Sequence, residues 1–538
     1  MSDDEPKIKG YHTFILPFTW EMPGVSHDKE YTALKAVFEK NSFWESTNLT
    51  NEDEILNRPD LKNDFDALRG FYKEYQYFFP YVRKSVYGGE DDICANYQLS
   101  ASRNNGTYHI LKGENHYVLN INAIRIRLVN TGIGLFIMEC ENYGFDFDGK
   151  PQNDIDSIKN INEYGRRVTL PFIQEDLWIT ADKLYVDIPG IGKFEDDFKQ
   201  FVTDTCKRKM DGADYISFRF TCNFIRELLS FNSSYRFTSH LSSQKNDIRI
   251  WPVLDDRMYV AFATCEKTFI EKVTELKDGD YCYKKDGELN NSIYEIAYTD
   301  NAGNCSCPDS KLRDELLEQA LYNRWLPYGT LYTITAMEMG MISSADIGGS
   351  LDYLYENFIT CYLQMVYITL IQRASIVKFN LETAEIARHF AANGKKLDRS
   401  GIRNIMNLQE RHAAFDSQLL FSEVSPEQQA IEMYDKLKQV FALEEEDKKL
   451  DDKLTSLYEI TDTDIGINVN IRVEILTKVS IILSLAALLY SILFTSSVAL
   501  SEVSGFTGTS NEAMYLLIIT LVLSIFFYIE VKIRNRRK

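Results

Sequence analysis

The chain has 538 residues, a formal net charge of −20 and 45% hydrophobic residues. This length exceeds what one hydrophobic core usually holds, so two or three structural units are expected. The acidic balance argues against general nucleic-acid binding, which requires a basic surface. The opening residues, MSDDEPKIKG, are acidic and contain no apolar run, so no secretory signal is expected there.

Residues 1–310 alternate between strand-like and helix-like patterns. Residues 11–20 are strand-like as far as Pro17, and residues 117–140 contain two apolar strands around the turn NTGIG. An isoleucine stripe over residues 155–161 predicts a short amphipathic helix that stops at Gly165. The alternation predicts a cytoplasmic α/β domain, which would act as the sensor. For the whole chain the expected fold class is α+β with a membrane part.

Five residues of this region are candidates for binding a nucleotide. Arg166 and Arg167 follow the predicted helix, and Arg125 and Arg127 lie on one face of a predicted strand. Guanidinium groups bind phosphates through paired hydrogen bonds. Tyr164 would stack on a base. The alternative is that these arginines form ordinary surface salt bridges.

The sequence contains no recognisable catalytic motif, so the chain is not expected to be an enzyme. TGIGLF and PGIGKF each provide only Gly-x-Gly, without the later residues of a phosphate-binding loop. There is no His-Glu-x-x-His. Cys282, Cys305 and Cys307 lack a fourth ligand for zinc.

Residues 311–470 are predicted to form a helical bundle and stalk. Residues 352–375 are apolar on several faces but contain polar positions, which indicates a buried helix and not a membrane span. His389 and His412 lie on predicted helices without paired metal-ligand spacing, so they are interpreted as ordinary histidines. Residues 426–460 are predicted to form one long helix with a leucine seam. It is either a solvated helix of its own domain or a stalk that packs against neighbouring subunits.

Residues 471–538 contain two apolar stretches, at about 479–500 and 513–529. Each is long enough to cross, or nearly cross, a hydrocarbon core about 30 Å thick. The connecting loop is acidic and the tail VKIRNRRK is basic. The positive-inside rule therefore predicts a multi-pass inner-membrane protein with both termini in the cytoplasm.

One face of the first predicted span carries hydroxyl groups at helical spacing. This stripe has two interpretations: small residues that let helices pack closely, or the wall of a pore. A pore requires a homo-oligomer, because two spans cannot enclose one. The candidate pore-lining residues are Asp462, Asn470, Thr477, Ser480, Ser484, Ser491, Thr495 and Glu502.

The order of these parts resembles the CorA family of divalent-cation channels: a cytoplasmic domain, a long helix, two spans with a short outer loop, and a basic tail. The resemblance implies a homopentamer in a lipid bilayer, with Mg²⁺ or another divalent cation as the permeant or regulatory ion. The Gly-Met-Asn signature expected at the end of the first span is replaced by SSVALSEVSGFTG.

The missing signature and the large N-terminal region make the chain most similar to the divergent CorA-like membrane effectors of type III CRISPR systems. That resemblance implies a channel opened by a nucleotide second messenger, adenylated S-adenosylmethionine, in antiviral defence, with no direct contact to nucleic acid. The alternatives are a constitutive magnesium transporter and a membrane-anchored binding scaffold that does not conduct.

Overall fold

The computed structural model describes residues 7–49, 52–56, 65–89, 92–100, 106–170, 177–211, 223–239, 244–277, 280–284, 286–392, 399–459, 473–474, 476–481 and 484. The chain divides into two units. The first comprises residues 1–389 and 403–454, and the second comprises residues 390–402 and 455–538.

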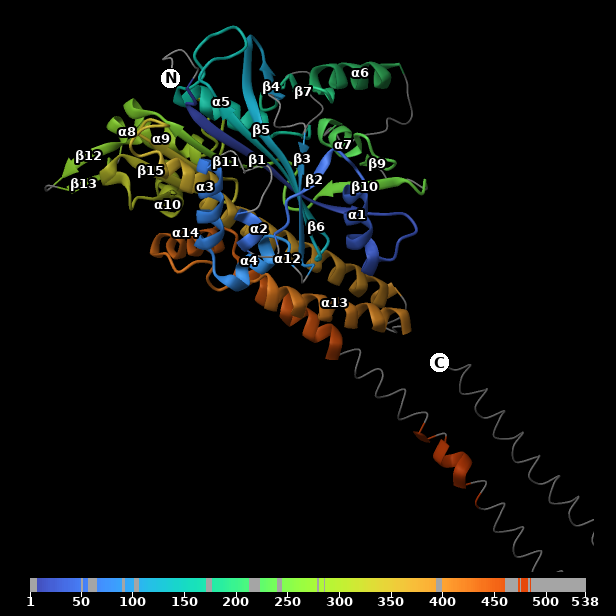
Figure 1. Cartoon of the computed structure of the whole chain (residues 1–538). Helices are drawn as coiled ribbons and strands as arrows, with labels where there is room; N and C mark the ends of the chain where they lie inside the picture. The colour runs from blue at the N-terminus through green and yellow to red at the C-terminus, as the bar shows by residue number, and fades with distance from the viewer. Residues whose placement is uncertain are drawn as a thin grey trace, which may run out of the picture. The chain divides into compact units, whose positions relative to one another are not determined.

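The first unit is built on a sheet of 14 strands (Figure 1). Its main path runs β14-β15-β16-β11-β1-β6-β5-β4-β7-β8, with β10 and β9 added beside β1, and β3 and β2 beside β5. The strands on that path, in spatial order, are Leu321–Tyr322, Thr330–Ile334, Glu338–Ser343, Tyr259–Cys265, Gly10–Glu21, Ile133–Asn142, Asn115–Val129, Gly106–Lys112, Lys183–Ile188 and Gly192–Asp197. The added strands β2, β3, β9 and β10 span Trp44–Ser46, Cys94–Leu99, Arg236–Thr238 and Asp247–Pro252.

Most strand pairs are antiparallel; β11 with β16 and β9 with β10 are parallel. Strands from residues 321–343 also join the sheet. The unit is therefore α+β, which agrees with the α+β part of the predicted fold class. A separate hairpin pairs β12, Thr274–Lys277, with β13, Asp280–Tyr283.

Strand β1 is central because its residues are apolar on both faces. It pairs with β11 through Gly10–Ile15 and with β10 through Phe18–Glu21, while β6 covers its other edge. Pro17 lies between these two partners, where its missing N–H removes no ladder bond. The strand therefore continues past Pro17 to Glu21, contrary to the expectation that it ends there.

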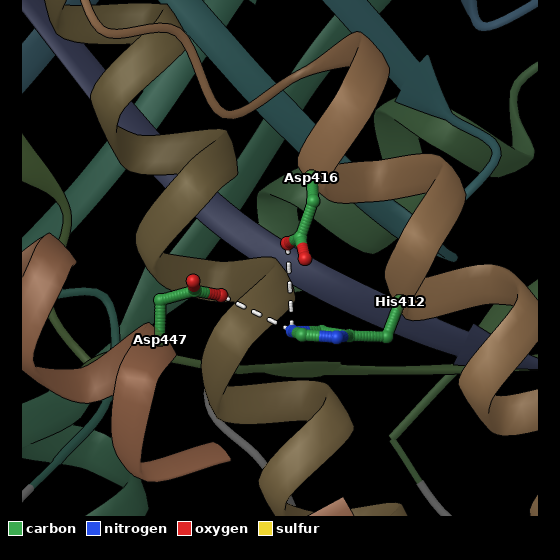
Figure 2. A group of neighbouring side chains, drawn as sticks. All are labelled: His412, Asp416 and Asp447. Carbon is green, nitrogen blue, oxygen red and sulfur yellow. Dashed lines mark hydrogen bonds and ion pairs between the residues drawn. The ribbon is translucent and has the colours of Figure 1, made fainter. Parts of the chain in front are cut away.

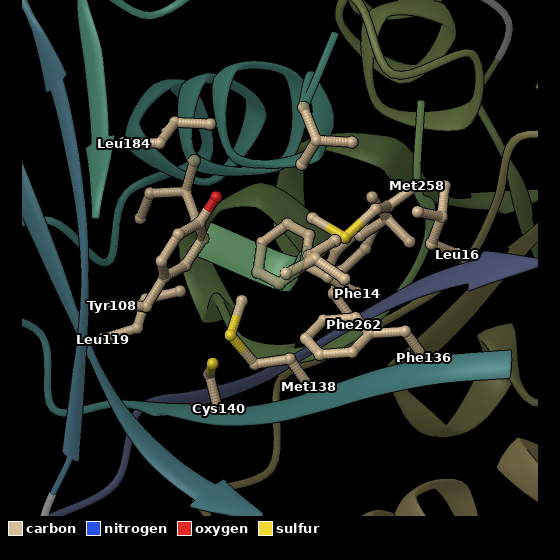
Figure 3. Packing of buried hydrophobic residues seen from close by; sticks show 14 of the residues in the cluster. Phe14, Leu16, Tyr108, Leu119, Phe136, Met138, Cys140, Leu184, Met258 and Phe262 are labelled. Atoms are coloured by element: carbon tan, nitrogen blue, oxygen red, sulfur yellow. The ribbon is translucent and has the colours of Figure 1, made fainter. Parts of the chain in front are cut away.

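One face of the sheet carries a core that includes Phe14, Phe136 and Phe262 (Figure 3). The helices that contribute to it are α1 (Glu30–Glu39), α5 (Ile155–Arg166), α6 (Phe198–Met210), α7 (Asn223–Ser230), α8 (Lys267–Val273), α9 (Gly287–Ala297) and α10 (Ser310–Ala320), together with the turn η3 (Leu326–Tyr328). Gly165 is the second-last residue of α5, which ends at Arg166, so the predicted end of the helix is right to within one residue, but Gly165 is not its capping residue. A Cβ at Gly165 would come within 2.9 Å of the Phe14 ring, which explains why glycine stands here.

The opposite face carries a second core in which Phe358, Tyr367, Phe415 and Leu450 are buried. Its helices are α2 (Glu52–Leu56), α3 (Phe65–Tyr77), α4 (Pro80–Val86), α11 (Tyr353–Asn357), the π-helical segment η4 (Phe358–Tyr362), α12 (Leu363–Ala392), α13 (Arg399–Gln418), α14 (Gln428–Val440) and the helical residues 443–459.

The predicted helix over residues 426–460 is two helices. Ala442 has a positive φ of 49° and interrupts it between α14 and residues 443–459. The predicted leucine seam is buried at Leu443, Leu450 and Leu454, which pack into the second core of their own unit. The structure thus favours a helix packed on its own domain for this segment.

The expectation of a transmembrane hairpin requires correction. Across the ranges that the structure describes, no helix combines the length and the apolar composition needed to cross a bilayer. The longest of these helices, α12, has 30 residues, but it carries Arg373, Lys378 and Glu382 and packs on the sheet. This finding contradicts the predicted membrane and ion-channel class and the predicted multi-pass inner-membrane location. Apart from residues 479–481 and 484, the predicted spans lie outside the described residues.

Candidate functional site

A cavity of about 180 Å³ lies in the first unit, beside the end of β1. Its lining comes from segments that are far apart in the sequence: β1 and the start of α1, the turn between β5 and β6, and the helices α12 and α13. Trp20, Gly132, Lys378 and Arg411 contribute to its wall from these four regions. The cavity therefore exists only after the sheet and the helices of the second core have packed together.

The β5–β6 turn is tied to its neighbours on both sides. The Thr19 hydroxyl donates a hydrogen bond to the Gly132 carbonyl at 2.8 Å, and the Thr131 and Ser375 hydroxyls are 2.8 Å apart. Gly132 has a φ of +85°, and a Cβ at this position would lie 2.5 Å from Nζ of Lys378. Glycine thus lets the turn adopt a left-handed conformation and lets the lysine reach the cavity.

Two cationic side chains face the cavity and share one carboxylate. Nζ of Lys378 lies 3.1 Å from Oε1 of Glu382, one turn along α12. Arg411 on α13 donates two hydrogen bonds to the same carboxylate, at 2.7 and 3.1 Å. Glu382 therefore orients both cations, and Glu30, which also lines the cavity, adds a second negative charge that acts on Lys378.

Burial lowers the pKa of Lys378 below its usual value, since the side chain is only 9% exposed. Glu382 opposes this lowering, and the charge of Arg411 adds to it. A lysine whose charge is disfavoured by burial gains from a further negative group. Trp20 also lines the cavity, and its indole Nε1 is buried without a hydrogen-bond partner.

The cavity wall carries charged groups of both signs. Lys378, Arg411 and the amide of Asn407 come from the helical side, whereas Asp28 and Glu30 come from the segment that begins α1. Such a wall offers both cationic groups and carboxylates to a small molecule.

Arg125 and Arg127 lie on β5 and contact other protein groups, Arg127 in the interior and Arg125 with a side chain that is 39% exposed. Arg125 forms an ion pair with Glu139 at 2.8 Å. Arg127 donates to Asn96 at 2.7 Å and to Gln364 at 2.9 Å. These partners connect the sheet to α12, so the two arginines help to hold the second core against the sheet.

The other three predicted nucleotide-binding residues belong to α5, on the opposite face of the sheet. Arg166 and Arg167 both pair with Glu163, at 2.8 and 2.5 Å. Tyr164 is buried, and the ammonium of Lys112 lies 5.4 Å from its ring centre. The five predicted residues therefore do not meet in one site.

The predicted pore-lining residues belong to the second unit. Thr477 and Ser484 donate their hydroxyls to backbone carbonyls one turn earlier, at Val473 and Ser480, both at 2.8 Å. Asp462, Asn470, Ser491, Thr495 and Glu502 lie outside the described residues.

A second polar group lies beside the cavity, one residue further along α13. His412, Asp416 and Asp447 place one imidazole nitrogen and two carboxylate oxygens within 4.8 Å of one another (Figure 2). The sequence interpretation treated His412 as an ordinary histidine. The overlooked signal is the spacing of His412 and Asp416, since residues four apart lie on the same face of a helix.

The fold and the cavity define the class: an α+β protein with a polar cavity between a large sheet and two helices. No family model, curated protein or solved structure matches the chain. The resemblance to CorA-like effectors remains an expectation from the sequence.

Proposed function

We propose that this chain is a non-catalytic binding protein that takes a small phosphate-bearing molecule, a nucleotide or nucleotide-like messenger, into the cavity between β1, α12 and α13. One observation carries the proposal: Lys378 and Arg411 reach the same cavity from two helices and share a single carboxylate. A phosphate group would accept hydrogen bonds from both cations.

Arg411 and Lys378 would contact a phosphate in different ways. Arg411 presents a planar fork that is suited to paired hydrogen bonds with phosphate oxygens, and Lys378 acts as a point charge with three donors. The carboxylates of Asp28 and Glu30, which also line the cavity, would repel a second phosphate but accept hydrogen bonds from sugar hydroxyls. A nucleoside monophosphate carries both kinds of group, whereas inorganic polyphosphates do not.

The cavity volume limits which part of a ligand is enclosed. A volume of about 180 Å³ holds a phosphate and an attached ring, and a larger messenger would extend through the open side. The proposed ligand is still the nucleotide messenger expected from the sequence. The proposed binding site is the cavity and not Arg125, Arg127, Arg166 and Arg167.

The test is calorimetric titration of the full chain with AMP, adenylated S-adenosylmethionine and uncharged adenosine. AMP or the adenylated compound is expected to bind at least tenfold more tightly than adenosine. The Lys378→Met variant is expected to lose about 1.5–3 kcal/mol of binding free energy, a 10- to 150-fold weaker affinity, because a charge-assisted hydrogen bond is removed.

Lys311→Met is the matched control, because the Lys311 side chain is 87% exposed and lies on α10, outside the cavity lining. Its affinity should equal that of the unaltered protein. Equal binding of AMP and adenosine, or an affinity that survives Lys378→Met, would contradict the proposal.

A further inference from the structure

His412, Asp416 and Asp447 form a compact group on the helical side of the first unit (Figure 2). Nε2 of His412 lies 3.1 Å from Oδ1 of Asp447 and 3.5 Å from Oδ1 of Asp416. Metal–ligand bonds of about 2.1 Å place neighbouring ligand atoms roughly 3.0–3.4 Å apart. The nitrogen and each oxygen thus already lie at the spacing of adjacent ligands on one ion, and rotation of the carboxylates closes the remaining distance.

The spacing along the chain supports the same geometry. His412 and Asp416 are four residues apart on α13, and Asp447 and Asp451 are four residues apart in the helical residues 443–459. Two facing helices that each present an i, i+4 pair are a common frame for metal sites in helical bundles. Asp451 is exposed and lies one helical turn beyond Asp447.

The imidazole is held in place from several sides. Its side chain is only 5% exposed, and the rings of Phe379 and Phe415 lie 5.8 and 6.2 Å from it. A ligand whose ring orientation is fixed before the ion arrives loses little conformational entropy on binding.

The charge of the group is unbalanced. Three carboxylates, those of Asp416, Asp447 and Asp451, surround a single imidazole, so even a protonated histidine leaves an excess of negative charge. A divalent cation would neutralise this excess.

We propose that His412, Asp416 and Asp447 bind one divalent metal ion, of the kind that accepts mixed nitrogen and oxygen ligands, such as Mn²⁺ or Zn²⁺. An imidazole with carboxylates suits these ions better than Ca²⁺, which takes an all-oxygen shell. The ion joins α13 to residues 443–454. This inference goes beyond the binding proposal for the cavity and does not depend on it.

The experiment titrates the full chain, after treatment with chelator, with Mn²⁺ alone and with Zn²⁺ alone. The expected result is one ion bound per chain and a rise in the unfolding temperature. The electron spin-echo spectrum of bound Mn²⁺ is expected to show coupling to one imidazole nitrogen. This spectrum tests the ligand set in the unaltered protein, whether or not a variant folds.

Asp447→Asn keeps the shape and a hydrogen bond to His412 but removes a charge, and it should weaken metal binding by more than about tenfold. His412→Ala should abolish the nitrogen coupling. The controls are Asp435→Asn and His389→Ala, whose side chains are exposed and lie on α14 and α12. Metal binding without nitrogen coupling, unchanged affinity in both site variants, or no saturable binding would overturn the proposal.

Discussion

Gly132→Ala tests whether the β5–β6 turn and Lys378 are packed as the structure shows. The substitution adds one methyl group at a residue with a φ of +85°. The new Cβ would lie 2.5 Å from Nζ and 2.9 Å from Cε of Lys378, well inside ordinary contact distance. The lysine has to withdraw, since the backbone of the turn is held by Thr19.

The expected loss of stability has two parts. A non-glycine residue in the left-handed region costs about 1–2 kcal/mol. Displacing Nζ breaks its contact with Glu382, and a charged hydrogen bond at this level of burial is worth about 1.5–3 kcal/mol. The two parts predict that Gly132→Ala lowers the free energy of unfolding by about 2.5–5 kcal/mol.

Urea-induced unfolding, followed by tryptophan fluorescence, measures this loss. Gly190→Ala is the matched control, because Gly190 has a φ of +78° with nothing within 4 Å of an added Cβ. It should lose only the backbone part, about 1–2 kcal/mol. In a Lys378→Ala background, Gly132→Ala should cost no more than this control. Equal losses for the two glycines in the unaltered background would refute the reasoning.

Three further variants probe other parts of the first unit. Burial raises the pKa of Glu338 well above its usual value, and neither carboxylate oxygen has a hydrogen-bond partner. The folded state therefore holds this proton more tightly than the unfolded state. The free energy of unfolding falls as the pH rises above the pKa of a glutamate in the unfolded chain, about 4.3. In urea unfolding, Glu338→Gln should be more stable than the unaltered protein at pH 8 and show a smaller advantage at pH 5. Leu450→Ala should cost about 2–5 kcal/mol in the same assay, since Leu450 is fully buried; a loss below 1 kcal/mol would contradict its place in the second core. Arg127→Lys should lower the free energy of unfolding by about 1–3 kcal/mol, because it loses the hydrogen bond to Gln364, and it should leave the AMP affinity in calorimetry unchanged. Weaker AMP binding at unchanged stability would indicate that Arg127 binds the ligand.

Local patterns in the sequence predicted local elements well. The strands around residues 117–140 and the helix over residues 155–161 are present as β5, β6 and α5. Pro17 does not end its strand and Gly165 does not cap its helix, for one reason. Each residue is a usual stop signal, but its neighbours in space decide its role: Pro17 sits between two strand partners, and Gly165 lets α5 approach Phe14.

The candidate site was less accessible to sequence reasoning. Trp20, Gly132, Lys378 and Arg411 are separated by up to several hundred residues, and only the packing of α12 and α13 on the sheet brings them together. Periodicity identifies which side chains share a helix face, as for Lys378 and Glu382, but not which other helix they meet. The arginines that stood out in the sequence, such as Arg125 and Arg166, already have acidic partners at neighbouring or nearby positions in the fold.

The two proposed sites share one structural element. Arg411 and His412 are consecutive residues of α13; the first pairs with Glu382 at the cavity, and the second faces Asp447. Both contact the ring of Phe379 on α12, at 5.3 Å from the guanidinium and 5.8 Å from the imidazole. A displacement of α13 against α12 therefore changes both environments together. If the ligand and the ion each favour one position of α13, linkage requires that each alters the affinity for the other by the same factor. If both sites are occupied as proposed, the shared contact with Phe379 couples occupancy of the cavity to the helical residues 443–454.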